Sequence, residues 1–170
     1  HKKSKNNNMK ISCDISNLED VKLMFEKINK KYGRIDLVVN SSSEEINPIN
    51  FNELKWGDFD LHIKNQLKGN FNLITQTSKF MGNWGGKIII INSAATDLPM
   101  KDFYHYSASK GALTSFIKSI ASELAIKGIQ INSISPSMVE SKQLDKVPDK
   151  VKMIVIAKTP LQRLCTPKDV

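Results

Sequence analysis

The stretch IIIINSAATDLPMKDFYHYSASKGAL, residues 88–113, decides the fold of this chain. Its first four residues form an uninterrupted apolar run, which is typical of a strand buried in a parallel sheet. A loop containing Pro99 follows, and the periodic segment after it predicts a helix from about Tyr104 to Lys127. A buried strand followed by a helix indicates an α/β protein.

The same alternation extends through the rest of the chain. Short apolar runs predict two further strands, and helical periodicity predicts three further helices. The expected strands cover residues 35–40, 87–91 and 129–134, and the expected helices cover 17–32, 53–81, 104–127 and 151–157. We therefore expect one domain over residues 1–170, built as a doubly wound parallel sheet of the Rossmann type.

Local signals mark where the first two helices begin and end. Ser16 and Glu19 match a capping box, and Gly33 supplies a C-terminal stop. The first helix is expected to bury one stripe of residues, namely Leu18, Val21, Phe25 and Ile28. The long helix over residues 53–81 is expected to break near Gly57, and the glycines of residues 82–86 are interpreted as a turn.

Composition and charge indicate an ordinary globular protein. Hydrophobic residues make up 40% of the chain, and no run approaches the length needed to span a bilayer. The net charge is +8, but the lysines are spread along the chain instead of forming one basic patch. We expect a cytoplasmic protein without a secretion signal, with neither a nucleic-acid nor a membrane partner, although a nucleic-acid binder remains an alternative.

The cysteines and histidines do not suggest a metal site or a disulfide framework. Cys13 and Cys165 are too far apart in sequence for a Cys-x-x-Cys site. The three histidines, His1, His62 and His105, show no ligand spacing. We expect no bound metal and a reduced cellular compartment.

Three residues around the quoted stretch suggest carbonyl or alcohol redox chemistry. Such chemistry requires a group that gives or takes the proton of the substrate oxygen, and Tyr106 is the candidate. Lys110 lies one helical turn later on the same face, where its charge is expected to lower the pKa of the phenol. Ser93 follows the strand at its carboxyl end, where ligands bind in doubly wound folds.

Each of these residues also has a purely structural reading. A tyrosine and a lysine four residues apart are common on the surface of a helix, where the lysine is solvated. A serine after a strand often caps a turn. The functional interpretation depends on all three residues occurring together at this spacing.

Five segments, taken in order, resemble the short-chain dehydrogenase/reductase family, and within it the 3-oxoacyl-carrier-protein reductases. They are CDIS at 13–16, GRIDLVVNSSS at 33–43, IIIINSAA at 88–95, YSASKGAL at 106–113 and INSISPSMVES at 131–141. The resemblance covers nearly all of residues 9–170. It implies an NAD(P)-dependent enzyme that exchanges a hydride with a small carbonyl or secondary-alcohol substrate. The cofactor is NADP or NAD, with NADP slightly favoured by the positive charge.

The resemblance also implies roles for individual residues. Ser93 would position the carbonyl, Tyr106 would be the general acid/base, and Lys110 would hold the nicotinamide ribose. The family's catalytic asparagine falls on Gln66. The other expected cofactor contacts are Asp14 and Ile15 at the adenine, Asn40 at the ribose with Ser41 and Ser42 beside it, and Pro136, Ser137, Val139 and Ser141 along the nicotinamide. A homodimer or homotetramer is expected through the helix over 104–127 and the long helix before it.

Several departures from the family pattern leave an alternative open. Gln66 replaces an asparagine, while Ser43 and Ser137 replace glycines, at a cost of about 1 kcal/mol each if the backbone needs a positive φ. These changes motivate the alternative of a catalytically silent scaffold that acts as a binding or oligomer-forming subunit. The family's N-terminal β-α-β-α portion, with its Gly-rich turn, and its last strand have no counterpart in these 170 residues. We therefore expect an incomplete fold, a piece of a longer chain that binds a dinucleotide weakly by itself.

Overall fold

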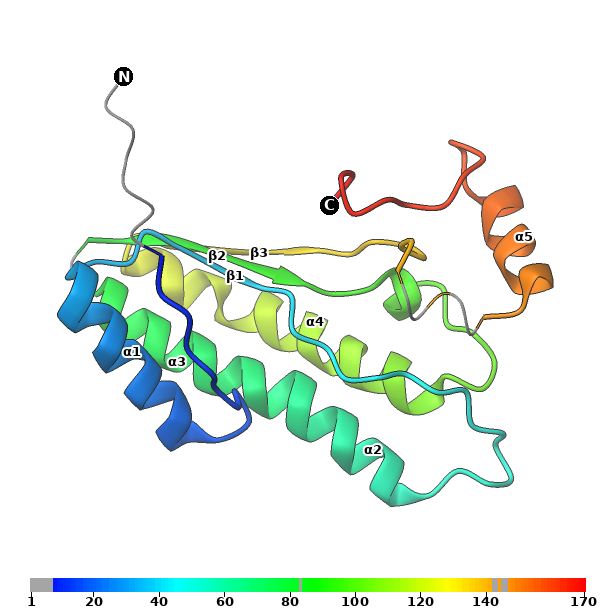
Figure 1. Cartoon of the computed structure of the whole chain (residues 1–170), viewed down its shortest axis with the longest axis horizontal. Coiled ribbons are helices and arrows are strands. Elements are labelled where there is room, and N and C mark those ends of the chain that lie inside the picture. The colour runs from blue at the N-terminus through cyan, green and yellow to red at the C-terminus, as the bar shows by residue number, and fades with distance from the viewer. Residues whose placement is uncertain (1–7, 83, 142–143, 145–146) are drawn as a thin grey trace.

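A computed structural model describes residues 8–82, 84–141, 144 and 147–170. Its elements follow one another as strands alternating with helices (Figure 1). In chain order they are α1 (Leu18–Tyr32), β1 (Leu37–Asn40), α2 (Trp56–His62), a π-helical segment (Ile63–Lys68), α3 (Gly69–Met81), β2 (Gly86–Ile91), a 3-10 turn (Ala94–Thr96), α4 (Tyr104–Ile126), β3 (Ile129–Ile134) and α5 (Asp149–Lys158). The predicted α/β class and all three predicted strands are confirmed.

The described strands form one parallel sheet in the order β1-β2-β3. Leu37 lies opposite Lys87 in the first pair, and Gly86 lies opposite Ile129 in the second. Parallel strands need a crossover between them, and here α2, α3 and α4 supply it. All three strands consequently end at the same edge of the sheet.

The described helices α1, α3 and α4 cover one face of the sheet (Figure 1). Ile88 and Ile90 of β2 point into that side and are almost completely buried. The alternate residues Leu37 and Val39 of β1 are more than half exposed, because no described helix lies over them. The parallel sheet with helices on one face of the described residues agrees with the predicted incomplete fold of the Rossmann type.

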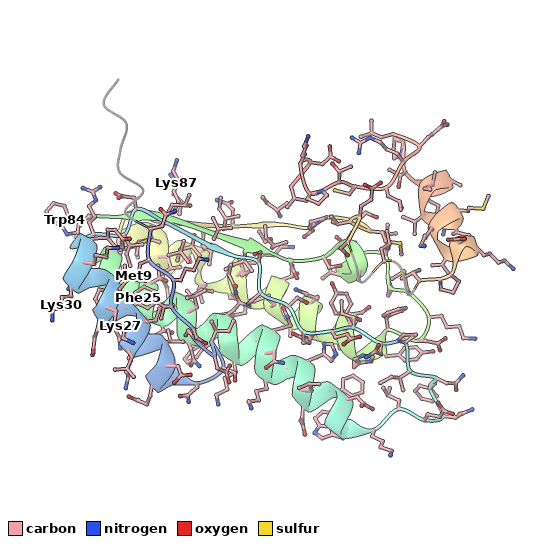
Figure 2. All side chains as sticks on the ribbon, viewed as in Figure 1. Met9, Phe25, Lys27, Lys30, Trp84 and Lys87 are labelled. Carbon is pink, nitrogen blue, oxygen red and sulfur yellow. The ribbon has the colours of Figure 1, made fainter. Side chains whose placement is uncertain are left out.

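Two apolar clusters hold these layers together. The larger one joins the sheet to α3 and α4 and contains Ile74, Met81, Ile88, Ile90, Leu113, Ile117, Leu124, Ile129 and Ile131. The smaller one joins α1 to α3 through Val21, Phe25 and Leu73. Phe25 stacks on Phe80 with ring centroids 5.1 Å apart, whereas Lys27 and Lys30 on the outer side of α1 point away from this cluster (Figure 2).

The beginning of α1 differs from the capping-box prediction. Asn17 is the cap, and its side chain accepts a hydrogen bond from the Glu19 amide at 3.0 Å. The Ser16 amide instead donates to the Asp14 carboxylate at 2.8 Å. The helix cap is therefore Asn17, one residue after the predicted cap Ser16. Leu18, which was predicted to belong to the buried stripe, is therefore exposed, whereas Val21 and Phe25 are buried as predicted. The predicted stop at Gly33 is confirmed by its left-handed φ of 70°.

The long helix is interrupted at a different place from the one predicted. Gly57 lies inside α2, and the helix continues without a break there. The irregularity is the π-helical turn at Ile63–Lys68, which inserts one residue into the helical ladder. Such turns occur frequently at functional sites.

The predicted turn before β2 is confirmed where the structure describes it, with Asn83 outside the described residues. Gly85 has a φ of 66°, and an added Cβ would lie 2.5 Å from the carbonyl oxygen of Gly128. Gly128 itself has a φ of 70° at the end of α4. Both positions favour glycine because of their left-handed φ. Gly85 also needs it because the backbone of Gly128 leaves no space for a side chain.

Gly69 allows the segment before α1 to pack on α3. A Cβ at Gly69 would lie 2.8 Å from Cγ1 of Ile15. The Asn72 side chain on the same helix donates to the Ile15 carbonyl at 3.0 Å. These two contacts bind residues 13–16 to the helix.

No helix of the described residues is long and apolar enough to cross a membrane.

The Gly69→Ala variant of the intact protein should lose about 1–3 kcal/mol of unfolding free energy, because the new methyl group overlaps the Ile15 side chain. Gly57→Ala is the matched control, since Gly57 is also helical and has nothing within 4 Å of an added Cβ. That variant should be unchanged or gain up to about 1 kcal/mol. Urea unfolding measures both, and equal effects would contradict the packing described.

Candidate active site

The carboxyl ends of the three strands bring the candidate residues to one edge of the sheet. Ser93 follows β2, and the segment containing Pro136 follows β3. The Asn92 amide donates to the Ile134 carbonyl at 2.7 Å, and the Ala94 amide donates to the Pro136 carbonyl at 2.9 Å. These bonds hold the two loops together beyond the end of the sheet.

Ser93 lies against Tyr106 of α4. The Ser93 hydroxyl accepts a hydrogen bond from the Ala95 amide at 3.1 Å, which starts the 3-10 turn at Ala94–Thr96. The same side chain also acts on the Tyr106 phenol, whose pKa it lowers. The capping role and the proximity to Tyr106 are therefore combined in one serine.

The pKa of Tyr106 moves in the opposite direction from the prediction. Burial raises the pKa above its ordinary value, and the nearby charge of Glu44 raises it further, while the Ser93 side chain lowers it. The Lys110 ammonium lies over the tyrosine ring, 5.8 Å from its centroid, and does not offset the burial. A pKa raised above its ordinary value keeps the phenol protonated at neutral pH.

Lys110 carries a buried charge at the centre of the site. Only 2% of the residue is exposed, and its Nζ donates to Oε1 of Gln66 at 2.7 Å. Burial lowers the pKa of Lys110 to about 8, while the carboxylate of Glu44 acts in the opposite direction. The amine is therefore mostly protonated at pH 7.

Gln66 links Lys110 to a second buried group. It lies in the π-helical turn, is 2% exposed, and its Nε2 donates to Oε2 of Glu44 at 2.7 Å. The Asn70 side chain donates to the Gln66 carbonyl oxygen at 2.7 Å, which supports the irregular turn. The extra methylene of glutamine, compared with asparagine, lets the amide reach the lysine directly.

Glu44 and His62 are site residues that the sequence analysis missed. Oε1 of Glu44 lies 2.5 Å from Nδ1 of His62, and both side chains are nearly inaccessible. Burial alone would raise the pKa of Glu44, but the interactions with His62 and Gln66 outweigh it and lower the pKa. In the sequence Glu44 is one polar residue of a loop, and no spacing signal connects it to His62 or Lys110.

Two of the histidines, His62 and His105, also meet, although no spacing in the sequence connects them. The rings of His62 and His105 lie edge to face with centroids 4.6 Å apart. Burial is the largest cause that lowers the pKa of His105. Among the described residues, no group of three or more potential ligands could hold a metal ion.

The side chain of Asn40 is engaged inside the protein. Its Nδ2 donates to Oδ1 of Asn70 at 2.8 Å, and its Oδ1 accepts from both the amide and the hydroxyl of Ser42. Asn40 therefore shapes the loop after β1, while Ser41 and Ser42 lie exposed beside it.

The remaining expected cofactor residues lie on segments around this centre. Asp14 is exposed, its carboxylate accepts from Ser16, and that hydrogen bonding lowers its pKa. Val139 forms an isolated bridge with Cys165. Ser137 and Ser141 are exposed.

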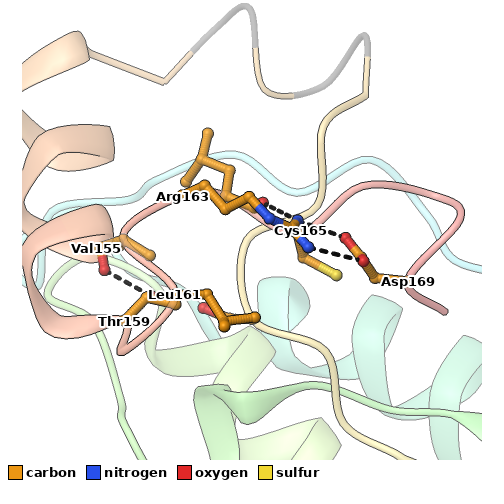
Figure 3. A pocket seen from close by; sticks show the side chains of 8 residues that line it. Val155, Thr159, Leu161, Arg163, Cys165 and Asp169 are labelled. Carbon is orange, nitrogen blue, oxygen red and sulfur yellow. Dashed lines mark hydrogen bonds and ion pairs between the residues drawn. The ribbon is translucent and has the colours of Figure 1, made fainter.

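The end of α5, the C-terminal segment and Ser137 line an open pocket of about 330 Å3 (Figure 3). Its walls are largely apolar and include Val155, Leu161 and Leu164, with Ser137 also lining it. Arg163 and Asp169 form a bidentate ion pair at 2.7 and 2.9 Å on the same wall. The pocket provides an apolar space next to the segment expected to contact nicotinamide.

The site fits a nicotinamide cofactor in its donor chemistry. An ammonium has three donors, and within the described residues Gln66 Oε1 is the acceptor that meets Lys110. Ribose hydroxyls of a bound cofactor would be suitable acceptors for the other two N–H groups of the ammonium. Neither Ser43 nor Ser137 has a positive φ, so the two replaced glycines cause no backbone strain here.

Comparison with known proteins identifies related enzymes. The model of the family described as enoyl-(acyl carrier protein) reductase matches residues 1–170. The 3-oxoacyl-(acyl-carrier-protein) reductase of Buchnera aphidicola subsp. Baizongia pistaciae is 31% identical over 173 residues, which cover 98% of this chain and 68% of that protein. The reductase of the same name from Thermotoga maritima is 28% identical, covering 92% and 64%.

A solved structure shares the fold. NAD+-bound xylitol dehydrogenase superimposes with a TM-score of 0.83 at 22% identity, covering 91% of this chain and 66% of that one. The acetoacetyl-CoA reductase of Cupriavidus necator is 25% identical over 158 residues, covering 92% and 64%. The chain thus spans about two thirds of the length of the relatives it matches.

The Asn40 and Asn70 amides should be energetically coupled, because removing either one leaves a buried polar partner unsatisfied. In the intact protein, Asn40→Ala and Asn70→Ala should each lower the unfolding free energy by about 1–3 kcal/mol. The double variant should lose less than the sum, by about 0.5 kcal/mol or more. Asn40→Ala combined with Asn29→Ala, an exposed position on α1, should be additive, and a strictly additive Asn40/Asn70 pair would contradict the bond.

Proposed function

We propose a function from one premise: the chain belongs to the short-chain dehydrogenase/reductase family. The protein is, on this proposal, an NAD(P)-dependent oxidoreductase that interconverts a carbonyl and a secondary alcohol. Tyr106 is the general acid/base, and Ser93, Lys110 and Gln66 complete the site. The coarse class, a nicotinamide-dependent oxidoreductase, follows from the family, whereas the roles of these residues are our proposal.

One observation carries the proposal most directly. Lys110 places its buried ammonium over the ring of Tyr106, 5.8 Å from the centroid, and Ser93 acts on the phenol from the end of β2. The structural reading of the tyrosine–lysine pair predicts a solvated lysine, but Lys110 is buried. A buried charge is costly unless it is paired, so a solvent-facing role does not explain its position.

The proposed reduction adds one hydride and one proton to the carbonyl group. A bound nicotinamide cofactor would supply the hydride to the carbonyl carbon. Ser93 would hold the carbonyl oxygen, and Tyr106 would transfer its phenolic proton to that oxygen. The raised pKa of Tyr106 favours the protonated phenol, which supports the reductive direction. Lys110 would bind the ribose hydroxyls and stabilise the phenolate that remains.

The relatives suggest the class of substrate. Two of them are named for reduction of 3-oxoacyl groups on acyl carrier protein, and a third for reduction of acetoacetyl-CoA. We propose a 3-oxoacyl thioester as the substrate, and the apolar pocket near Ser137 supports an acyl chain there. NADP and NAD both remain candidates, with NADP slightly favoured.

The departures from the family do not favour the silent-scaffold alternative. The Gln66 amide makes a hydrogen bond to Lys110, and Ser43 and Ser137 lie in ordinary backbone conformations. A protein that binds the cofactor but reduces no ketone would nevertheless favour that alternative.

An exposed apolar surface supports the proposed homodimer or homotetramer. A groove of about 340 Å3 runs between the long helix and α4, lined by Ile63, Leu67, Lys68, Phe71 and Phe116. Phe71 is 51% exposed and lies 6.1 Å from Phe116 between ring centroids. Covering this surface with a second copy would remove apolar area from water.

Tyr106→Phe should reduce the turnover of acetoacetyl-CoA by about 10²–10⁴-fold in the intact protein, because the proton donor is lost. Turnover is followed by the absorbance of NADPH, and then of NADH. Tyr104→Phe is the matched control, since Tyr104 lies on the same helix and packs against Phe51. The control should retain near-normal turnover, whereas Tyr106→Phe within twofold of the wild type would refute the proposed proton route.

Phe71→Glu should shift the intact protein toward the monomer in analytical ultracentrifugation, because it places a charge in the proposed interface. Leu23→Glu replaces a similarly exposed residue of α1, which is 52% exposed. It should leave the sedimentation coefficient unchanged. An unchanged oligomer in Phe71→Glu would exclude this surface as the contact.

A further inference from the structure

A continuous line of short contacts leads from Lys110 to the loop after β1. Lys110 Nζ donates to Gln66 Oε1 at 2.7 Å, and Gln66 Nε2 donates to Glu44 Oε2 at 2.7 Å. The other carboxylate oxygen of Glu44 lies 2.5 Å from Nδ1 of His62. Three elements, the loop after β1, the π-helical turn and α4, are thereby joined through side chains.

The carboxylate of Glu44 determines which way the Gln66 amide points. An amide has a donor end and an acceptor end, whereas an ionised carboxylate only accepts and an ammonium only donates. With Glu44 on one side, the NH2 group must face it, and the oxygen must then face Lys110. A neutral or apolar residue at position 44 would remove this second constraint, so that Lys110 alone would orient the amide.

The charge of Glu44 acts on Lys110 as well. The titratable groups around the lysine are Glu44 on the loop, His62 on α2, and His105 and Tyr106 on its own helix. The 3-10 turn packed on α4 carries no charged side chain, and the sheet contributes isoleucines and Asn92. Burial lowers the pKa of Lys110 and Glu44 raises it, so the carboxylate is the group that opposes neutralisation of the amine.

We propose that Glu44 is a positioning residue of the site, which acts on Lys110 through the Gln66 amide and controls both the direction of that amide and the charge of the lysine. This inference deepens the proposed function and rests on it for the consequence in catalysis. If the pKa of Lys110 falls, the amine becomes neutral at a lower pH than in the wild type. Activity that depends on the ammonium should then also be lost at a lower pH.

The test measures the titration of Lys110 in the intact protein. Lysine labelled with 13C at Cε is followed by NMR against pH, and the Lys110 signal is assigned by its loss in Lys110→Arg. In Glu44→Gln the midpoint should move to lower pH by about one pH unit. Glu45→Gln removes the same charge from the adjacent exposed residue and should leave the midpoint unchanged. An unmoved midpoint in Glu44→Gln would overturn the inference.

A second variant keeps the test decisive if Glu44→Gln is isolated unfolded. Gln66→Leu retains the carboxylate but removes the amide, so the ammonium loses its acceptor and should also titrate at lower pH. A wild-type midpoint in this variant would overturn the proposed route through Gln66.

Catalysis provides the readout that separates this inference from the proposed function. The alkaline limb of kcat/KM for acetoacetyl-CoA reduction should move with the Lys110 midpoint in Glu44→Gln, while a structural defect alone would lower kcat/KM equally at every pH. A protein that reduces no ketone yet shows the shifted Lys110 titration contradicts the proposed function and supports the role of Glu44. An unmoved limb in an active variant with a shifted titration would refute the catalytic part of the inference.

Discussion

A buried ammonium is the constraint on which the rest of the site depends. Lys110 is almost inaccessible to water, so the energy of keeping its charge must come from neighbouring groups. The Gln66 oxygen accepts a direct hydrogen bond from the ammonium. Glu44, which is hydrogen-bonded to the other end of the Gln66 amide, supplies the opposite charge. The loop after β1 and the long helix must therefore hold their positions for the lysine to stay protonated beside Tyr106.

Side-chain amides maintain that arrangement across elements that are distant in sequence. Asn70 accepts a hydrogen bond from Asn40 at the end of β1 and donates one to the Gln66 carbonyl in the π-helical turn. The strand end and the helix irregularity are thus coupled through one residue. Buried polar networks of this kind are favourable only when each member is satisfied, which makes them sensitive to single substitutions.

Tyr106 and Lys110, both on α4, respond to burial in opposite directions. Burial disfavours the charged form, so it raises the pKa of the Tyr106 phenol and lowers that of the Lys110 amine. Near neutral pH this leaves a protonated phenol beside a protonated amine. That combination supports proton donation to a carbonyl oxygen, in keeping with relatives that are named as reductases.

The sequence by itself determined the order of strands and helices and the placement of Ser93, Tyr106 and Lys110, because apolar periodicity and i to i+4 spacing are local properties. The tertiary structure decided the position of the helix irregularity and the direction of the Tyr106 pKa. It also decided the roles of Glu44 and His62, which lie 66 and 48 residues before Lys110 in the chain. Such contacts depend on how parallel strands end at one edge and how helices pack there, and neither composition nor spacing encodes which polar side chains will meet.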